Sequence, residues 1–285
     1  MAASAGATVV LPARGLRADL SAIWVVWKRE LITSFRNRWR LVMALVQPLL
    51  FLFVLGNGLQ TVASGSIGGF SFKTFLFPGV LATAVFMPAL FSAGSIVFDR
   101  EFGFMREMMV APIRRSSIVI GKCLGGATVA SVQGVLVLAL AGAAHVPYDI
   151  PMLLALLGEM LLLSTALVAF GTMLAAGITQ FMSFQALMQT VMFPLVFLSG
   201  TLFPQSGLPG WLEVVTKLDP LSYAVDPLRR TVFNAVDAPD SVRSVLDPGI
   251  HWWGWAVPMG LELAIVAATG LLMLAIAVWR FERIE

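Results

Sequence analysis

The sequence has little charge. Only 12% of its 285 residues are Asp, Glu, Lys or Arg, while 58% are hydrophobic. This composition excludes a water-soluble globular domain of this length and predicts an integral membrane protein. The 19 basic residues barely outnumber the 16 acidic ones, so the net charge gives no indication of nucleic-acid binding.

Residues that could carry chemistry are also scarce. The single cysteine, Cys123, excludes an internal disulfide and a cysteine-rich metal site, and the two histidines, His145 and His251, stand apart. The sequence contains no HExxH, no GxSxG and no GxxxxGK[ST] phosphate loop. We therefore expect no catalytic residue, no metal site and no cofactor bound by this chain.

Long apolar runs dominate the chain. At 1.5 Å per residue, about 20 residues cross the roughly 30 Å of bilayer hydrocarbon. Runs of this length predict an all-α membrane protein with six transmembrane helices, at about 41–60, 74–97, 117–143, 152–176, 181–202 and 255–279. Pro78 and Pro88 predict kinks in the second span. The GxxxG spacing of Gly121 and Gly125 permits close approach of another helix to the third.

An amphipathic helix is predicted ahead of the first span. Its two faces carry apolar residues (Leu20, Trp24, Trp27, Leu31, Phe35) and basic residues (Arg29, Arg36, Arg40). Such a helix either lies in the membrane interface or packs on a protein partner. The chain shows no secretory signal peptide, and most of its Lys and Arg fall before residue 41, in 99–122 and in the tail. This distribution predicts that both termini are cytoplasmic.

Residues 98–122 interleave acids, bases, Phe and Met at helical spacing between two spans. Phe102, Met105 and Met108 recur at intervals of three, and Pro112 ends the pattern, so a short amphipathic helix is expected at about 99–112. It is either a docking element or an ordinary loop with solvated charges. A second polar region, about 204–251, contains apolar pieces too short to cross, and Pro209 opens a short helix there.

Two segments in this order, 98–122 and LDPLSYAVDPLRR at 218–230, resemble the permease subunit of type-2 ATP-binding-cassette exporters, including antibiotic-resistance and lipo-oligosaccharide exporters. The similarity covers nearly the whole chain. It implies a cytoplasmic N-terminal segment with an interfacial helix, 1–40, before a permease domain, 41–285. It also implies a re-entrant outer hairpin at 204–251 and a coupling helix that docks on an ATPase through Arg100, Glu101, Phe102, Met105, Arg106, Glu107 and Met108.

The same resemblance implies the partners. Two cytoplasmic ATPase subunits would bind ATP and magnesium, a second permease copy would complete a homodimer, and membrane lipid would surround a complex in a bacterial plasma membrane. The cargo is expected to be an amphipathic drug, antibiotic or lipid, with a polysaccharide or lipo-oligosaccharide as the alternative. A membrane-embedded enzyme or channel would need clustered polar residues at mid-depth.

Two further sets of residues are candidates within the spans. Spans two and five carry aromatic and Met side chains that would form either a deformable apolar cargo path or ordinary packing: Phe86, Met87, Met188, Met192, Phe193 and Phe197. Glu159 and Glu262 are the acids assigned to spans. They either face a polar cargo or a proton, or are hydrogen-bonded between helices or reach toward the interface.

Overall fold

The computed structural model describes residues 16–58, 71–104, 114–201, 209–236, 249–252 and 254–284. Within these residues, six helical stretches are long and apolar enough to span a membrane, which confirms the predicted all-α integral membrane protein. They are Leu41–Gly58, Phe72–Glu101, Arg115–Leu138, Ile150–Ala175, Phe181–Leu198 and Met259–Arg283.

The first two spans are each built from two helical pieces. In the first, α2 (Arg38–Leu50) contains Pro48, which has no N–H to donate, and continues as the π-helical turn η1 (Phe51–Leu55). In the second, α4 (Phe72–Ser92) runs through both prolines that predicted kinks and is interrupted instead at Ala93. The next piece, α5 (Gly94–Glu101), carries the helix past the predicted end of the span.

Gly94, directly after the interruption in the second span, lies against α9 (Phe181–Leu198). A Cβ atom at this position would lie 3.0 Å from the ring of Phe181 and 3.1 Å from that of Phe184. Only a residue without a side chain lets α5 and α9 approach so closely.

The other spans are α7 (Arg115–Leu138), α8 (Ile150–Ala175) and α13 (Met259–Ile284), with the short 3-10 helix η2 (Ala141–Ala144) between α7 and α8. A two-stranded ribbon, β1 (His251–Trp252) and β2 (Trp255–Ala256), precedes α13. The last span therefore begins at Met259 and not at the predicted Trp255, because Trp255 pairs with Trp252 in this ribbon.

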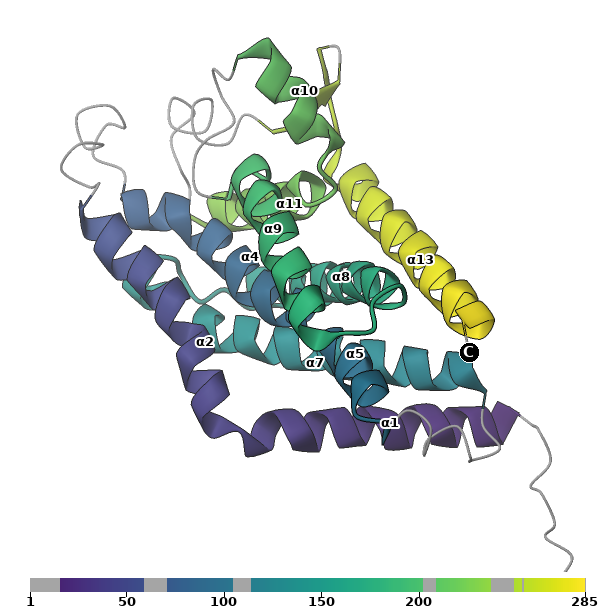
Figure 1. Cartoon of the computed structure of the whole chain (residues 1–285). Helices are drawn as coiled ribbons and strands as arrows, with labels where there is room; N and C mark the ends of the chain where they lie inside the picture. The colour runs from purple at the N-terminus through teal and green to yellow at the C-terminus, as the bar shows by residue number, and fades with distance from the viewer. Residues whose placement is uncertain are drawn as a thin grey trace, which may run out of the picture.

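The amphipathic N-terminal helix is α1 (Leu16–Arg36). Figure 1 shows it beside α7, at one end of the bundle. Two glycines of α7 explain the contact, because a Cβ at Gly121 would lie 2.8 Å from the Val26 side chain and a Cβ at Gly125 would lie 2.6 Å from that of Glu30. The close approach predicted from the GxxxG pattern is confirmed, and its partner is the chain's own first helix.

The region between the last two spans contains two described helices, α10 (Gly210–Leu218) and α11 (Ser222–Ala235). The short helix predicted after Pro209 is confirmed by α10. The helix α11 is largely buried and contacts α4, α8 and α13.

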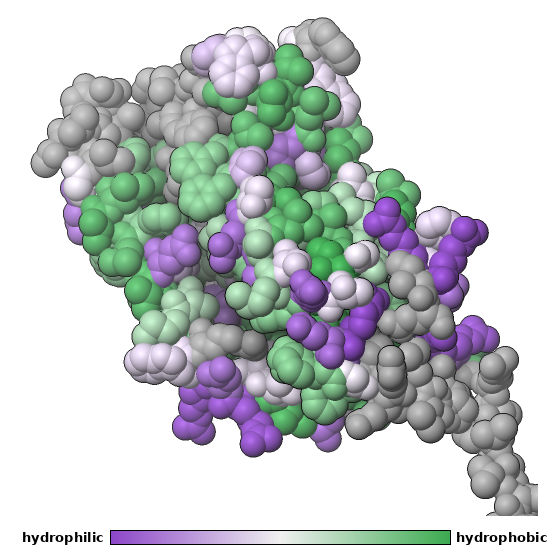
Figure 2. All heavy atoms as spheres, in the orientation of Figure 1, coloured by the Kyte–Doolittle hydropathy of each residue, from purple (hydrophilic) through white to green (hydrophobic). Residues whose placement is uncertain are grey.

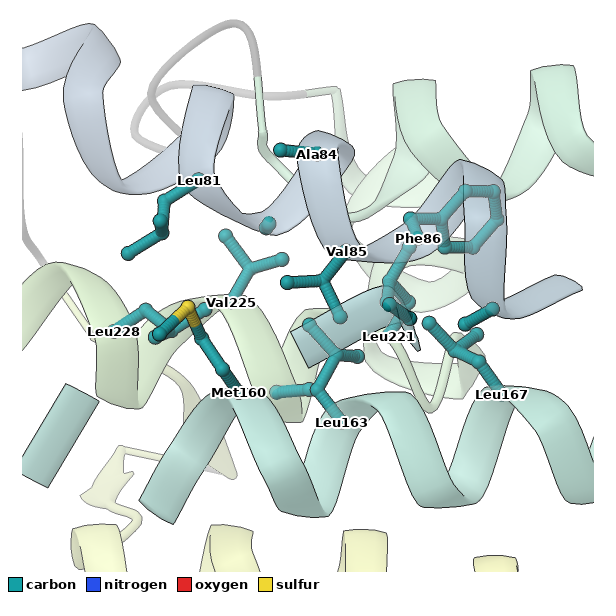
Figure 3. Packing of buried hydrophobic residues seen from close by; sticks show 14 of the residues in the cluster. Leu81, Ala84, Val85, Phe86, Met160, Leu163, Leu167, Leu221, Val225 and Leu228 are labelled. Carbon is teal, nitrogen blue, oxygen red and sulfur yellow. The ribbon is translucent and has the colours of Figure 1, made fainter. Parts of the chain in front are cut away.

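The apolar core lies where α4, α8 and α11 meet. Figure 3 shows Val85 of α4 facing Leu163 of α8, and the same core cluster includes Phe86 of α4, Leu167 of α8 and Val225 of α11. All five side chains are buried. Within a bilayer, lipid tails are as apolar as these side chains, so packing and polar contacts between helices specify the fold more than transfer out of water does.

Three spans, α2, α9 and α13, bury little of their surface within the chain. In Figure 2 hydrophobic residues cover much of the face formed by α2 and α9, and hydrophilic residues gather mainly toward the end that carries α1 and toward the end of α13. These spans therefore present apolar side chains to lipid or to another chain.

Candidate functional site

The residues predicted to dock on an ATPase start in α5 and continue past the described residues. Met105, Arg106, Glu107 and Met108 lie outside the described part of the chain, as does most of the helix predicted at 99–112. Phe102 directly follows α5, is 60% exposed and contacts Phe98 with ring centroids 4.4 Å apart and the rings tilted by 40°. Gly103 then adopts a φ of 81°, which a glycine tolerates, and turns the chain out of the helix.

Arg100 and Glu101 are engaged within the chain, a role that the sequence did not predict. The Arg100 guanidinium donates hydrogen bonds to the carbonyls of Ala176 and Ile178, at 3.2 and 3.0 Å, beyond the C-terminus of α8. The Glu101 carboxylate accepts a 2.7 Å hydrogen bond from the N–H of Phe181, the first residue of α9. A cation at a helix C-terminus and an anion at an N-terminus both complement the helix dipole. Arg100 and Glu101 at the end of α5 thus hold the turn between α8 and α9, and we call these contacts the clamp.

A network of four charged side chains lies next to this clamp. The Lys122 ammonium, 2% exposed, donates to Asp99 at 2.6 Å and to Glu30 at 3.0 Å. Arg29 donates to both oxygens of Asp99, at 3.1 and 3.2 Å, and this hydrogen bonding raises the pKa of the Arg29 guanidinium above its usual value. The network ties together α1, α5 and α7 with two positive and two negative charges.

Sequence reasoning placed Asp99 at the start of the amphipathic helix predicted at about 99–112 and did not connect it with α1. Both Asp99 and Lys122 are buried, since only 4% of each whole residue is exposed. A buried charge is costly unless it is paired and hydrogen-bonded, and here each is. In the sequence, the feature that could have indicated this network is the presence of charged residues within stretches that are otherwise apolar and helical.

The ion network forms one end of a cavity of about 520 Å³. Five helices line it: α1, α2, α4, α5 and α7, with Phe181 of α9 at its edge. Its walls are apolar at Met43, Met87 and Phe91. A second set of polar side chains, from α2, α4 and α7, also lines the cavity: Gln47, Thr83, Ser92 and Gln133. This arrangement can accommodate a molecule with both apolar and polar parts.

The residues predicted to line a cargo path occupy three different environments. Only Met87 lines this cavity. Phe86 and Met188 are buried in the core, and Met192 packs against it. Phe193 and Phe197 lie on the exposed face of α9 with their rings stacked at 5.9 Å. The structure therefore does not bring the six together in one path, because two are core residues, one packs against the core and two lie on an exposed face.

Glu159 and Glu262 both hold α11 in place. The Glu262 carboxylate is fully buried and pairs with Arg230 at 3.0 Å. The Glu159 carboxylate accepts a 2.7 Å hydrogen bond from Thr231. Of the two alternatives for these acids, the contacts correspond to hydrogen bonding between helices. The motif at 218–230 supplies the partner for one of them and further buried polar residues, including Asp226 and Arg229.

Asp219 lies at the bend between α10 and α11. Its carboxylate accepts a 2.9 Å hydrogen bond from the N–H of Leu221, while its other oxygen is buried without a hydrogen-bond partner among the residues described. Burial raises the pKa of Asp219 to about 7, and the bond from Leu221 opposes part of this rise. Near neutral pH this side chain therefore takes up or releases a proton.

Among the residues that the structure describes, no three His, Cys, Asp or Glu side chains are grouped so that they could hold a metal ion. Cys123 is buried against Thr172. Neither observation adds a catalytic centre to the cavity.

Comparison with known proteins gives consistent matches over most of the chain. A family profile described as ABC-2 type transporter matches residues 21–233. The chain is 29% identical over 216 residues to a putative transport permease, ycf38, of Cyanophora paradoxa, covering 74% of this chain and 73% of that protein. It is 30% identical over 237 residues to nodulation protein J of Rhizobium leguminosarum bv. viciae, covering 78% of this chain and 84% of that protein.

Proposed function

Because the chain belongs to the ABC-2 type transporter family, we propose that it is the membrane-spanning permease of an ATP-driven exporter that carries amphipathic molecules out of the cell. A separate ATPase subunit supplies the energy, with ATP and magnesium bound on that subunit. The lack of a phosphate loop in this sequence supports this division of labour.

The segment that follows Gly103 transmits the movement of the ATPase. Its support is the contact pattern just before it: Phe102 is exposed at the end of α5, while Arg100 and Glu101 clamp the turn between α8 and α9. A displacement of this segment is transmitted to α8 and α9 through the clamp. It is transmitted to α1 through the ion network.

A second copy of the chain completes the transport path. The exposed apolar faces of α2 and α9, including Phe193 and Phe197, support this part of the proposal, because a path for a polar group cannot be bounded by lipid on one side. Two ATPase subunits would then serve two permeases. Both termini and the α1 end of the bundle lie in the cytoplasm, in agreement with the distribution of Lys and Arg along the sequence.

The observation that carries the proposal is the cavity of about 520 Å³, with its ion network at one end and its apolar walls of Met and Phe. An amphipathic cargo matches both parts. A polysaccharide or lipo-oligosaccharide is the second candidate, and the neutral polar side chains from α2, α4 and α7 in the same cavity favour it.

Reconstitution with the cognate ATPase in liposomes tests the function. We expect ATP-dependent transport of a fluorescent amphipath, and we expect Phe102→Ala combined with Arg106→Glu to abolish most of it while the melting temperature stays unchanged. The matched control is Phe53→Ala with Lys73→Glu, a Phe and cation in contact elsewhere in the chain, which should transport normally. Full transport by the first variant, or transport without any ATPase, would refute the proposal.

A further inference from the structure

One polar side chain in the cavity lacks a partner. Gln133 of α7 is 3% exposed and lines the cavity, yet its Oε1 atom has no hydrogen-bond partner among the residues that the structure describes. A buried amide oxygen without a partner is unfavourable, and more so in a bilayer, where water cannot substitute. Gln133 therefore marks a position that a bound molecule would satisfy.

The neighbouring hydroxyl groups have the same hydrogen-bonding character. Thr83 donates its proton to the carbonyl of Val80 at 2.8 Å, and Ser92 donates to that of Ala89 at 2.7 Å. Each hydroxyl therefore offers only lone pairs to the cavity. With the Gln133 oxygen, three acceptors belong to residues of α4 and α7 that line the cavity, and the NH2 group of the same amide adds donors. A hydroxyl group, which both donates and accepts, complements this set.

Gln133 lies apart from the charges along α7. Lys122, Gly126, Val129 and Gln133 follow one another along one face of α7, and the distance from Lys122 to Gln133 is about 16 Å at 1.5 Å per residue. Met87 and Phe91 of α4 form the apolar wall of the same cavity. A molecule bound at Gln133 thus contacts apolar side chains together with neutral acceptors, away from the ion network.

We propose that Gln133 determines specificity by accepting a hydrogen bond from a hydroxyl group of a neutral amphipathic cargo, whose apolar part lies against Met87 and Phe91. This proposal rests on the proposed export function, since it names the chemical class of the cargo. It assigns the recognition to one amide oxygen, supported by the acceptor of Thr83.

The test compares two probes with the same apolar chain. Tritiated decyl β-glucoside carries hydroxyl donors, and its fully O-methylated derivative carries none. We expect the full chain in lipid nanodiscs to bind the first about tenfold more tightly, the effect of about one buried hydrogen bond. Gln133→Met, of similar length, should reduce the ratio to less than twofold, whereas Gln180→Met, the same change at an exposed position in the turn before α9, should preserve it.

Further readouts separate the outcomes. Gln133→Met should also raise the melting temperature of the empty protein, because it removes the unsatisfied oxygen, and Thr83→Val should lower the binding ratio if Gln133→Met does not fold. A wild-type ratio near one, or an unchanged ratio in Gln133→Met, would overturn the proposal. Binding with the expected preference but without stimulation of an ATPase partner would contradict the export function and leave the assignment of Gln133 standing.

Discussion

Lys122 is the residue on which the ion network depends. It is the only member bonded to both acids, and it also donates to Ser95 at 3.2 Å. Arg29 also pairs with Asp99, but its side chain is 44% exposed. Loss of Lys122 would therefore leave Glu30 without its cation in a poorly solvated place.

We expect Lys122→Met to lower the free energy of unfolding by about 3 kcal/mol, because removing one partner of a buried ion pair leaves an uncompensated charge. Thermal unfolding in detergent, followed by tryptophan fluorescence, measures the loss. Lys28→Met on the exposed surface of α1 is the control and should change stability by less than about 0.5 kcal/mol. A similar effect of the two substitutions would show that the network contributes nothing to stability.

Asp219 makes stability depend on pH. Its pKa is raised to about 7 in the folded chain, above the value of an exposed carboxyl, so between about pH 4 and 7 the folded state binds more protons than the unfolded state. The contribution of Asp219 to stability is therefore present at low pH and is lost as the pH rises toward and through 7. We expect melting temperatures from pH 5 to 8 to fall more steeply for the wild type than for Asp219→Asn. Parallel curves would contradict the assignment.

At the scale of residues, sequence reasoning identified acids and bases but not their partners. Asp99 pairs with Arg29, 70 positions away, and with Lys122, 23 positions away. No periodic pattern links residues at such separations, since the pairing depends on how three helices pack. The same reason explains why Gln133 was missed: an amide in an apolar run has no signature until the cavity beside it is known.

At the scale of elements, the contact between α1 and α7 depends on the absence of side chains at two positions. Helices that approach this closely place backbone against backbone, and any larger residue would separate them. The ion pair between Glu30 and Lys122 lies across the same contact. Glycine packing and charge pairing in this pair of helices are therefore coupled.

Gly125→Leu tests this coupling. A Cβ there would lie 2.6 Å from the side chain of Glu30, so we expect α1 to separate from α7 and trypsin to cleave after Lys28 or Arg29 at least several-fold faster. Gly158→Leu on α8 is the matched control, because no atom lies within 4 Å of a Cβ at that position. Equal cleavage of both variants would mean that α1 is held by other contacts.

The elements were predicted well where length and apolarity decide them. All six spans exist because runs of this length have no other way to satisfy their backbone in a bilayer. Their ends were predicted less well. The helix of span two continues to Glu101 because Arg29, Lys122 and the α8–α9 turn neutralise its charged end, and Trp255 leaves span six because it pairs in a ribbon.

At the scale of the whole molecule, polar groups gather at two levels of the bundle. The ion network and the clamp lie at the end that carries α1, and the buried charges of α11 lie toward the other end. The orientation of this bundle stays a prediction from the sequence, and its internal arrangement was not predicted, since the sequence of one chain does not reveal which spans are neighbours.

Cysteine labelling tests the orientation. In a Cys123→Ala background, Asp149→Cys, between α7 and α8, should react with a membrane-impermeant maleimide in intact cells. Ser183→Cys, at the start of α9, should react only after the cells are permeabilised, because it lies on the cytoplasmic side in the proposed topology. Labelling of Ser183→Cys in intact cells would reverse the topology.

The ion network joining α1, α5 and α7 contains as many positive as negative charges. A single charge that crosses a potential of 100 mV exchanges about 2.3 kcal/mol with the electric field, whereas a neutral set that moves as a unit exchanges almost none. If the network shifts when the ATPase subunits close, that step does no electrical work. Export of an uncharged cargo should consequently proceed at the same rate in polarised and in depolarised vesicles.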